Sequence, residues 1–197
     1  MLVKDVMSHD PVTVTEDTPI KAAITRLARH RITAMPVLTR SGRLCGVVSE
    51  ADLIRDLVDA DPRAHEIPLD ERPWHDRPQA VGEVMSPHTI TVQPNTELAT
   101  AVDLITSTSV KSVPVVNPTG GVVGMLSRAD VVQMLARADA DIEREVDAML
   151  ASVGLEDCVA EVTDGTVALS WPEDAGQKAL ARLVASTVPG VIEVRFV

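Results

Sequence analysis

The sequence predicts an α+β protein with two repeated strand–helix–strand–strand–helix units and a small C-terminal domain of order helix–strand–strand–helix–strand. First, Val6-Met7-Ser8 recurs as Val84-Met85-Ser86, and this offset of 78 residues aligns about 50 positions without a gap. Second, the segment from residue 139 has a separate pattern and contains 4 of the 18 basic but 12 of the 29 acidic residues. The expected boundaries are 1–58 for repeat 1, 59–82 for a linker, 83–137 for repeat 2 and 139–197 for the C-terminal domain.

Each repeat is expected to begin with a strand and a helix. Val12-Thr13-Val14 is a β-branched stretch typical of a strand. Thr18-Pro19 predicts a capped helix start with proline at the first helical position. Apolar residues then fall on one helical face in both repeats: Ile20, Ala23, Ile24 and Leu27, and, after Thr96, Leu98, Ala101, Val102 and Ile105.

A hairpin and a second helix complete each repeat. The strand Met35-Pro36-Val37-Leu38 corresponds to Val113-Pro114-Val115-Val116, and a glycine-containing turn follows each copy. The second strand ends at Ser49-Glu50-Ala51-Asp52 in repeat 1 and at Ser127-Arg128-Ala129-Asp130 in repeat 2. Ser49 and Ser127 are expected to open helices with these apolar residues: Leu53, Ile54, Leu57, Val131, Val132 and Leu135.

The linker and the C-terminal segment are predicted from turn residues and periodicity. Four prolines in residues 59–82 resist regular structure, and Trp74 is expected to pack across the repeats or to mark a partner surface. Asp164-Gly165 predicts a hairpin turn, after which Val167, Leu169 and Trp171 are expected to alternate outward. The helices are predicted from two apolar sets: Ile142, Val146, Met149, Leu150 and Val153, then Ala179, Leu180, Leu183, Val184 and Val188.

Composition argues against several classes of function. A net charge of −11 and 2% aromatic residues disfavour nucleic-acid binding, which needs basic and stacking surfaces. The acidic C-terminal segment disfavours anionic membranes. Two cysteines without CxxC spacing and five histidines without ligand spacing indicate no metal site and a reducing, cytoplasmic location. We find no nucleophile–base constellation, so we expect a protein that is not an enzyme.

These features resemble two known families. The Val-Met-Ser entry, the x-Pro-Val strand and the Gly-h-h-Ser-x-x-Asp turn (h, apolar), each present twice, resemble a tandem pair of CBS domains, or Bateman module, across residues 1–137. In the C-terminal segment, Val-x-Asp-Gly-x-Val-x-Leu-Ser and Val-Pro-Gly-Val-x-x-Val resemble a BON domain. Trp171-Pro172 departs from that pattern, because many BON domains have a glycine after Leu-Ser.

The CBS resemblance implies a ligand site. Such pairs bind AMP, ADP, ATP, S-adenosylmethionine (SAM) or NAD in clefts between paired units and associate into homodimers. Asp52 and Asp130 would hold ribose hydroxyls, while Ser49, Ser127 and Arg128 would face phosphate. The base would be enclosed by residues around four positions in the strands: Val12-Thr13, Met35-Pro36, Thr89-Ile90 and Val113-Pro114. Because Arg128 offers a mobile cation and Glu50 would repel phosphate, we expect the Asp130 site to prefer phosphorylated ligands and the Asp52 site a less charged adenosyl group or nothing.

Two alternatives stay open. Ser-x-x-Asp is also a capping box, in which both side chains satisfy amides at a helix start. Some CBS pairs bind no nucleotide, so the chain could be a scaffold that dimerises through its CBS pair and docks a protein partner through its C-terminal domain.

Overall fold

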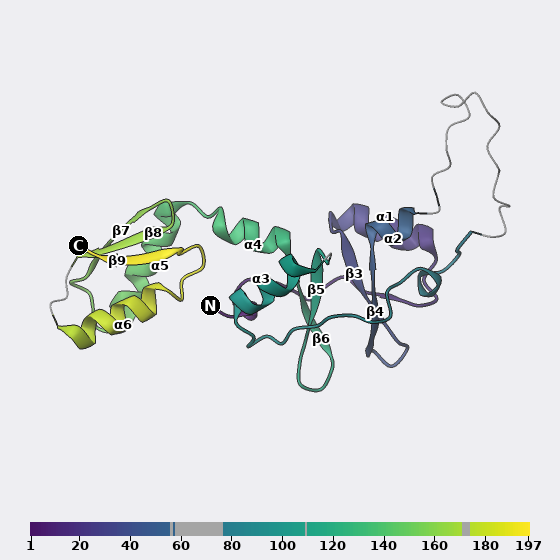
Figure 1. The fold of residues 1–197 in the computed structure, drawn as a ribbon, viewed down its shortest axis with the longest axis horizontal. Helices are drawn as coiled ribbons and strands as arrows, with labels where there is room; N and C mark the ends of the chain where they lie inside the picture. Colours follow the sequence, from purple (N-terminus) through teal and green to yellow (C-terminus); the bar gives the residue numbers. More distant parts are fainter. Residues whose placement is uncertain (56, 58–76, 109, 171–173) are drawn as a thin grey trace, which may run out of the picture. The chain divides into compact units, whose positions relative to one another are not determined.

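The computed structural model describes residues 1–55, 57, 77–108, 110–170 and 174–197. It has an α+β fold with three three-stranded sheets in the described part (Figure 1). The chain divides into two compact units. One unit comprises Met1–Met7, Pro94–Ser109 and Leu126–Val197, and the other comprises Ser8–Gln93 and Val110–Met125. Most of the predicted linker, with Trp74, and also Trp171 lie outside the described residues.

Repeat 1 has the predicted order of elements. They are β2 (Val14–Thr15), α1 (Ile20–His30), β3 (Ala34–Leu38), β4 (Leu44–Ser49) and α2 (Glu50–Ile54). Strand β3 pairs parallel with β2 and antiparallel with β4, so the sheet order is β2-β3-β4. The buried core contains the predicted helical residues Ile20, Ala23 and Leu27, together with Met35 and Leu53.

The start of α1 differs from the prediction. Thr18 does not cap the helix, because its Oγ1 accepts from Thr15 N at 3.0 Å and so closes the turn before it. The helix begins one residue later, at Ile20, and Pro19 stands at the N-cap position with no side-chain hydrogen bond. A shift of one residue is within the ordinary uncertainty of a helix boundary.

Repeat 2 departs from the prediction at its first strand and its last helix. Its elements are the 3₁₀ helix η4 (Val81–Glu83), α3 (Leu98–Ser107), β5 (Ser112–Val116), β6 (Val122–Ser127) and α4 (Arg128–Leu135). An isolated parallel bridge between Val92 and Val115 stands where a strand was expected. Helix α4 has no buried residue, and Val132 and Leu135 are 64% and 49% exposed.

The entry segments of the two repeats exchange partners, which the sequence did not predict. Strand β1 (Ser8–His9), from the entry of repeat 1, pairs antiparallel with β6 of repeat 2, with Ser8 opposite Met125. Ser86, at the equivalent entry of repeat 2, exchanges two backbone hydrogen bonds with Val47 in β4, at 3.1 and 2.9 Å.

A second exchange lies at the starts of the long helices. Val3, in the 3₁₀ helix η1 (Val3–Asp5), donates its N–H to Thr96 O at 2.9 Å. Val81 donates equivalently to Thr18 O, also at 2.9 Å. The offset of 78 relates Val3 to Val81 and Thr18 to Thr96. The entry segment of each repeat therefore makes the same hydrogen bond to the other repeat.

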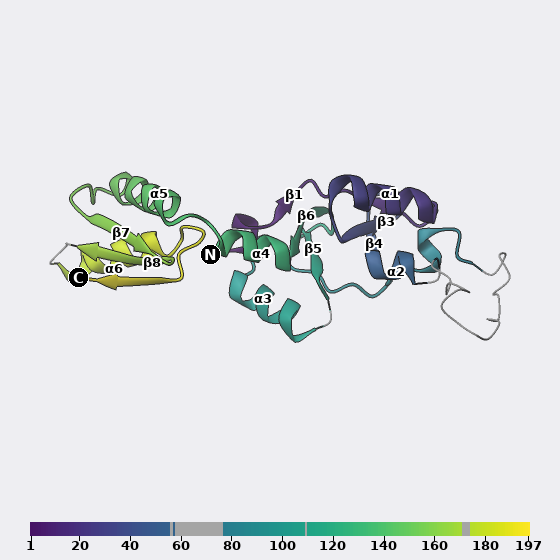
Figure 2. The same ribbon diagram turned by 90° about the horizontal axis from the view of Figure 1, so that it is seen from above.

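The C-terminal segment forms a two-layer sandwich (Figure 2). It contains α5 (Asp139–Ser152), β7 (Val159–Thr163), β8 (Thr166–Ser170), α6 (Ala175–Ala185) and β9 (Glu193–Phe196), with sheet order β7-β8-β9. Both helices share one core with residues of all three strands. Two side-chain expectations are wrong. Val167 and Leu169 are fully buried rather than outward-facing, and Leu183 is 63% exposed because α6 buries Ala181, Val184 and Ala185 instead.

Candidate functional site

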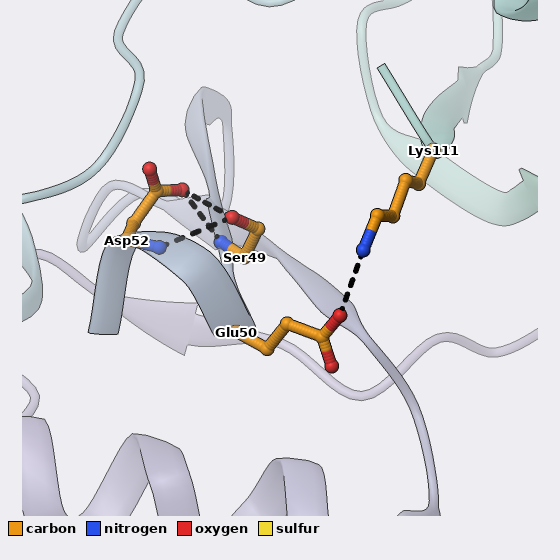
Figure 3. Close-up of polar contacts among 4 residues, drawn as sticks. All are labelled: Ser49, Glu50, Asp52 and Lys111. Atoms are coloured by element: carbon orange, nitrogen blue, oxygen red, sulfur yellow. Dashed lines mark hydrogen bonds and ion pairs between the residues drawn. The ribbon is translucent and has the colours of Figure 1, made fainter. Parts of the chain in front are cut away.

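The Ser49–Asp52 turn joins β4 to α2 and is closed by a complete capping box (Figure 3). Asp52 Oδ2 accepts from Ser49 N at 2.9 Å and from Ser49 Oγ at 2.6 Å, while Asp52 N donates back to Ser49 Oγ at 3.3 Å. The other carboxylate oxygen, Oδ1, lies 3.9 Å from the Arg55 guanidinium. The cap therefore uses one oxygen of Asp52.

The charge of Glu50, the first residue of α2, is countered from another part of the same compact unit. Lys111 Nζ, just before β5, lies 3.0 Å from Glu50 Oε1, and Figure 3 shows its side chain reaching toward the turn. The backbone of Glu50 is also fixed, because its N–H donates to Thr33 O at 2.8 Å. No sequence motif connects Lys111 with the turn, so Lys111 was not among the predicted site residues.

The Ser127–Asp130 turn joins β6 to α4 and repeats this capping geometry. Asp130 Oδ2 accepts from Ser127 N at 2.7 Å and from Ser127 Oγ at 2.6 Å, and Asp130 N donates to Ser127 Oγ at 3.2 Å. Both capping boxes predicted as the alternative interpretation of the motif are thus present.

Arg128 is not the mobile cation that the sequence analysis expected. Its Nη2 donates to Ile105 O at 2.8 Å and to Thr108 O at 3.2 Å, so the guanidinium binds the carboxyl-terminal end of α3. Helix termini leave carbonyls without intrahelical partners, and a nearby arginine is a suitable donor. This contact takes away the mobile cation expected at the Asp130 turn, and Lys111 partly counters the charge of Glu50 at the Asp52 turn. The ranking of the two turns by phosphate preference stays a prediction.

The remaining predicted ligand residues differ in exposure. Met35, Pro36, Val113 and Pro114 are buried in β3 and β5, so only a rearrangement would bring their side chains to a ligand. Val12, Thr13 and Thr89 are half-buried, and Ile90 is 39% exposed. The turn of Ser127, Arg128 and Asp130 belongs to the other compact unit.

A hollow of about 240 Å³ lies elsewhere in the Ser8–Gln93 unit. Its lining residues are Thr15, Glu16, Asp17, Leu38 and Arg40, none of which was predicted to bind a ligand. The described residues hold no cluster of three or more His, Cys, Asp or Glu that could bind a metal. Burial raises the pKa of the Cys45 and Cys158 thiols, so both are neutral near pH 7 and poorly nucleophilic. No helix in the described ranges is long and apolar enough to cross a bilayer.

Comparison with known proteins establishes the family. A model described as the CBS domain matches residues 3–59 and 81–137, which is more than half of the chain. The chain therefore belongs to the CBS-domain family and contains a tandem CBS pair, which confirms that resemblance. The matched ranges end before the C-terminal sandwich, so its similarity to a BON domain stays a prediction.

Known proteins and solved structures are similar to about two thirds of this chain. The uncharacterized protein MJ1426 of Methanocaldococcus jannaschii is 29% identical over 154 residues, which cover 68% of this chain and 91% of that protein. CBSX2 of Arabidopsis thaliana, solved in complex with AMP, has a TM-score of 0.52 and 26% identity, covering 67% of this chain and 93% of that structure. The CBS pair of MJ0100, solved with 5′-methylthioadenosine and S-adenosyl-L-methionine, has a TM-score of 0.56 and 22% identity, covering 68% and 94%. Because the identity to MJ0100 is only 22%, this similarity shows a shared fold and nothing more.

Proposed function

We propose that this protein is a non-catalytic regulator whose CBS pair binds an adenosine-containing ligand: AMP, ADP, ATP, SAM or NAD. The main observation is that the Ser-x-x-Asp turn occurs twice, with the same three capping hydrogen bonds, in a chain that belongs to the CBS family. The likeness to CBSX2, which binds AMP in its solved structure, supports an adenosine ligand.

In this proposal Asp52 and Asp130 hold ribose hydroxyls, because a carboxylate can accept both hydroxyl protons. Capping and ligand binding are compatible at Asp52, since the cap takes Oδ2 while Oδ1 has Arg55 at 3.9 Å as its ion-pair partner among the described residues. The hydroxyls of Ser49 and Ser127 would stay in the cap. Backbone atoms and apolar edges at four places would enclose the base: Val12-Thr13, Met35-Pro36, Thr89-Ile90 and Val113-Pro114.

The proposal also includes a homodimer and a route by which ligand binding affects a protein partner. Ligand binding would change the packing of the repeats or of two protomers in a cytoplasmic homodimer. The C-terminal sandwich, as a separate BON-like domain over 139–197, would pass that change to a protein partner. We also propose that the two CBS domains span residues 1–58 and 83–137 and that residues 59–82 link them.

Thermal unfolding of the full chain with AMP, ATP, SAM and NAD tests ligand binding. A ligand at 100 times its Kd should stabilise the protein by about 2.7 kcal/mol, which is a readily measured rise in Tm. Asp52→Asn and Asp130→Asn should each reduce that rise, whereas Asp17→Asn, which removes an exposed carboxylate elsewhere, should not. Unchanged shifts in both turn variants would contradict the proposed roles.

The alternative is a scaffold whose CBS pair dimerises without ligand. It is favoured by the capping boxes, which fully account for the Ser-x-x-Asp motif as a helix start. No thermal shift with any of the four ligands at millimolar concentration, in a protein that sediments as a dimer, would support this alternative.

A further inference from the structure

The Ser49–Asp52 turn brings two carboxylates and one distant cation together. Glu50 and Asp52 are two positions apart on the turn, and their cations are different: Lys111 at 3.0 Å from Glu50 and Arg55 at 3.9 Å from Asp52. Arg55 stands at the C-cap of α2, whereas Lys111 comes from the segment before β5 of the other repeat. Lys111 is therefore the cation that repeat 2 contributes to the turn of repeat 1.

The Glu50–Lys111 pair is close but solvent-exposed. The two side chains are 44% and 63% exposed, and such pairs typically change an equilibrium constant by less than about fivefold. Solvent access to both groups means that a soluble anion can compete for Lys111 without first opening a buried contact. A phosphate group is a strong competitor, because it has more charge and more acceptor oxygens than one carboxylate.

The positions in repeat 2 that are equivalent to Glu50 and Lys111 cannot form the same pair. The offset of 78 places Arg128 at the position of Glu50 and Thr33 at the position of Lys111. Arg128 binds the carbonyls of Ile105 and Thr108, and Thr33 has no charge. The pair is thus specific to the first turn and is not a general consequence of the repeated fold.

We infer that Glu50 is a built-in competitor for Lys111 and determines how the Asp52 site selects among adenosine ligands. This inference rests on the proposed function. A ligand with a phosphate must replace the Glu50 carboxylate at Lys111 and tolerate Glu50 nearby, whereas adenosine leaves the pair intact. Glu50 therefore lowers the affinity of this site for AMP without affecting adenosine.

Calorimetric titration of the full chain with AMP and with adenosine tests the inference. All proteins carry Asp130→Asn, so that the heat reports the first turn. Glu50→Gln should increase AMP affinity about two- to fivefold, as removal of one exposed ion pair allows, and should change adenosine affinity less than twofold. Lys111→Met should lower AMP affinity by a similar factor, again without changing adenosine. Glu97→Gln, which removes one negative charge at the N-cap of α3, is the matched control and should change neither.

The possible failures are distinguishable. Equal effects of Glu50→Gln on AMP and adenosine, or a loss of AMP affinity, would overturn the competitor role while leaving nucleotide binding intact. Absence of binding for both ligands in every variant, and also in the protein with Asp130 intact, with circular dichroism showing folded protein, would overturn the proposed function and the competitor role with it. Higher salt should reduce the AMP difference between Glu50→Gln and its parent, and an unchanged difference would also contradict an electrostatic competitor.

Discussion

The two CBS repeats have the same turn but use its second residue differently. The C-cap residue of α1 is Arg31, whose left-handed backbone (φ 54°) lets Ile32 N donate to Leu27 O at 3.1 Å. The C-cap residue of α3 is Thr108, which is extended, and the equivalent carbonyl, Ile105 O, instead accepts from the Arg128 side chain. The carbonyl at the helix end therefore accepts from a backbone N–H in repeat 1 and from an arginine side chain in repeat 2.

This difference shows that the charge of a motif residue does not reveal its role. Arg128 follows Ser127 in the Ser-x-x-Asp turn, yet its guanidinium donates to carbonyls at the end of the preceding helix. Repeat 1 needs no such donor, so the same position holds Glu50, which pairs with Lys111. How the preceding helix ends thus decides which residue the turn position can accommodate.

The largest expected effect concerns the glycine that both repeats place in their second hairpin strand. A Cβ on Gly46 would lie 2.7 Å from Ser86 O and 3.0 Å from Met85 Sδ, at the exchanged entry segment. Overpacking of this kind costs about 1–3 kcal/mol, so Gly46→Ala should lower stability by that amount in urea denaturation. Gly42→Ala, where φ is +80° but nothing lies within 4 Å, isolates the backbone cost of about 1 kcal/mol. A Gly46→Ala protein more stable than Gly42→Ala would disprove the close contact.

A smaller effect distinguishes Arg128 from Glu50. Arg128→Met leaves the carbonyls of Ile105 and Thr108 without this donor and should destabilise the protein by about 1 kcal/mol, the usual contribution of a hydrogen bond. Glu50→Gln removes only an exposed pair and should change stability by less than about 0.5 kcal/mol. Urea midpoints at constant slope measure both. Equal losses of unfolding free energy in the two variants would contradict a structural role for Arg128 that Glu50 lacks.

The smallest effect is a pH dependence confined to repeat 1. A hydrogen bond from Thr15 and the nearby Arg40 hold the pKa of Asp17 below its ordinary value. Its stabilisation is therefore complete above the unfolded-state pKa of about 4 and is lost as pH falls through the lower folded-state value. The equivalent residue, Asn95, accepts from Lys4 Nζ at 3.0 Å and does not titrate. Asp17→Asn should remove one acid-limb transition from an NMR-monitored pH titration, and Asn95→Ala should remove none.

The sequence predicted the fold better than the site. A repeated apolar pattern reports which faces are buried, so the order of elements in repeat 1 and the helical core residues Ile20, Ala23 and Leu27 were predictable. The capping boxes were also predictable, because their partners are three residues apart. The Glu50–Lys111 pair was not, since 61 residues separate its members and only the folded chain brings them together. Leu183 shows that helical spacing alone does not identify the buried face. Its spacing predicted a core position, but α6 buries Ala181, Val184 and Ala185 instead.

The reciprocal exchange of entry segments has a consequence for evolution and for dissection of the molecule. Ser8 pairs with β6 of repeat 2, and Ser86 hydrogen-bonds to Val47 in β4 of repeat 1. The hairpin of each repeat therefore needs a segment of the other repeat to complete its backbone hydrogen bonds. A single repeat cut from the chain would have an open strand edge and a vacant acceptor at the start of its long helix. Two copies of such a fragment could satisfy each other by swapping entry segments, which is a low-cost route to dimers. The tandem pair therefore contains, within one chain, the reciprocal exchange of a swapped dimer, and we expect the pair, rather than a single repeat, to fold when it is transplanted.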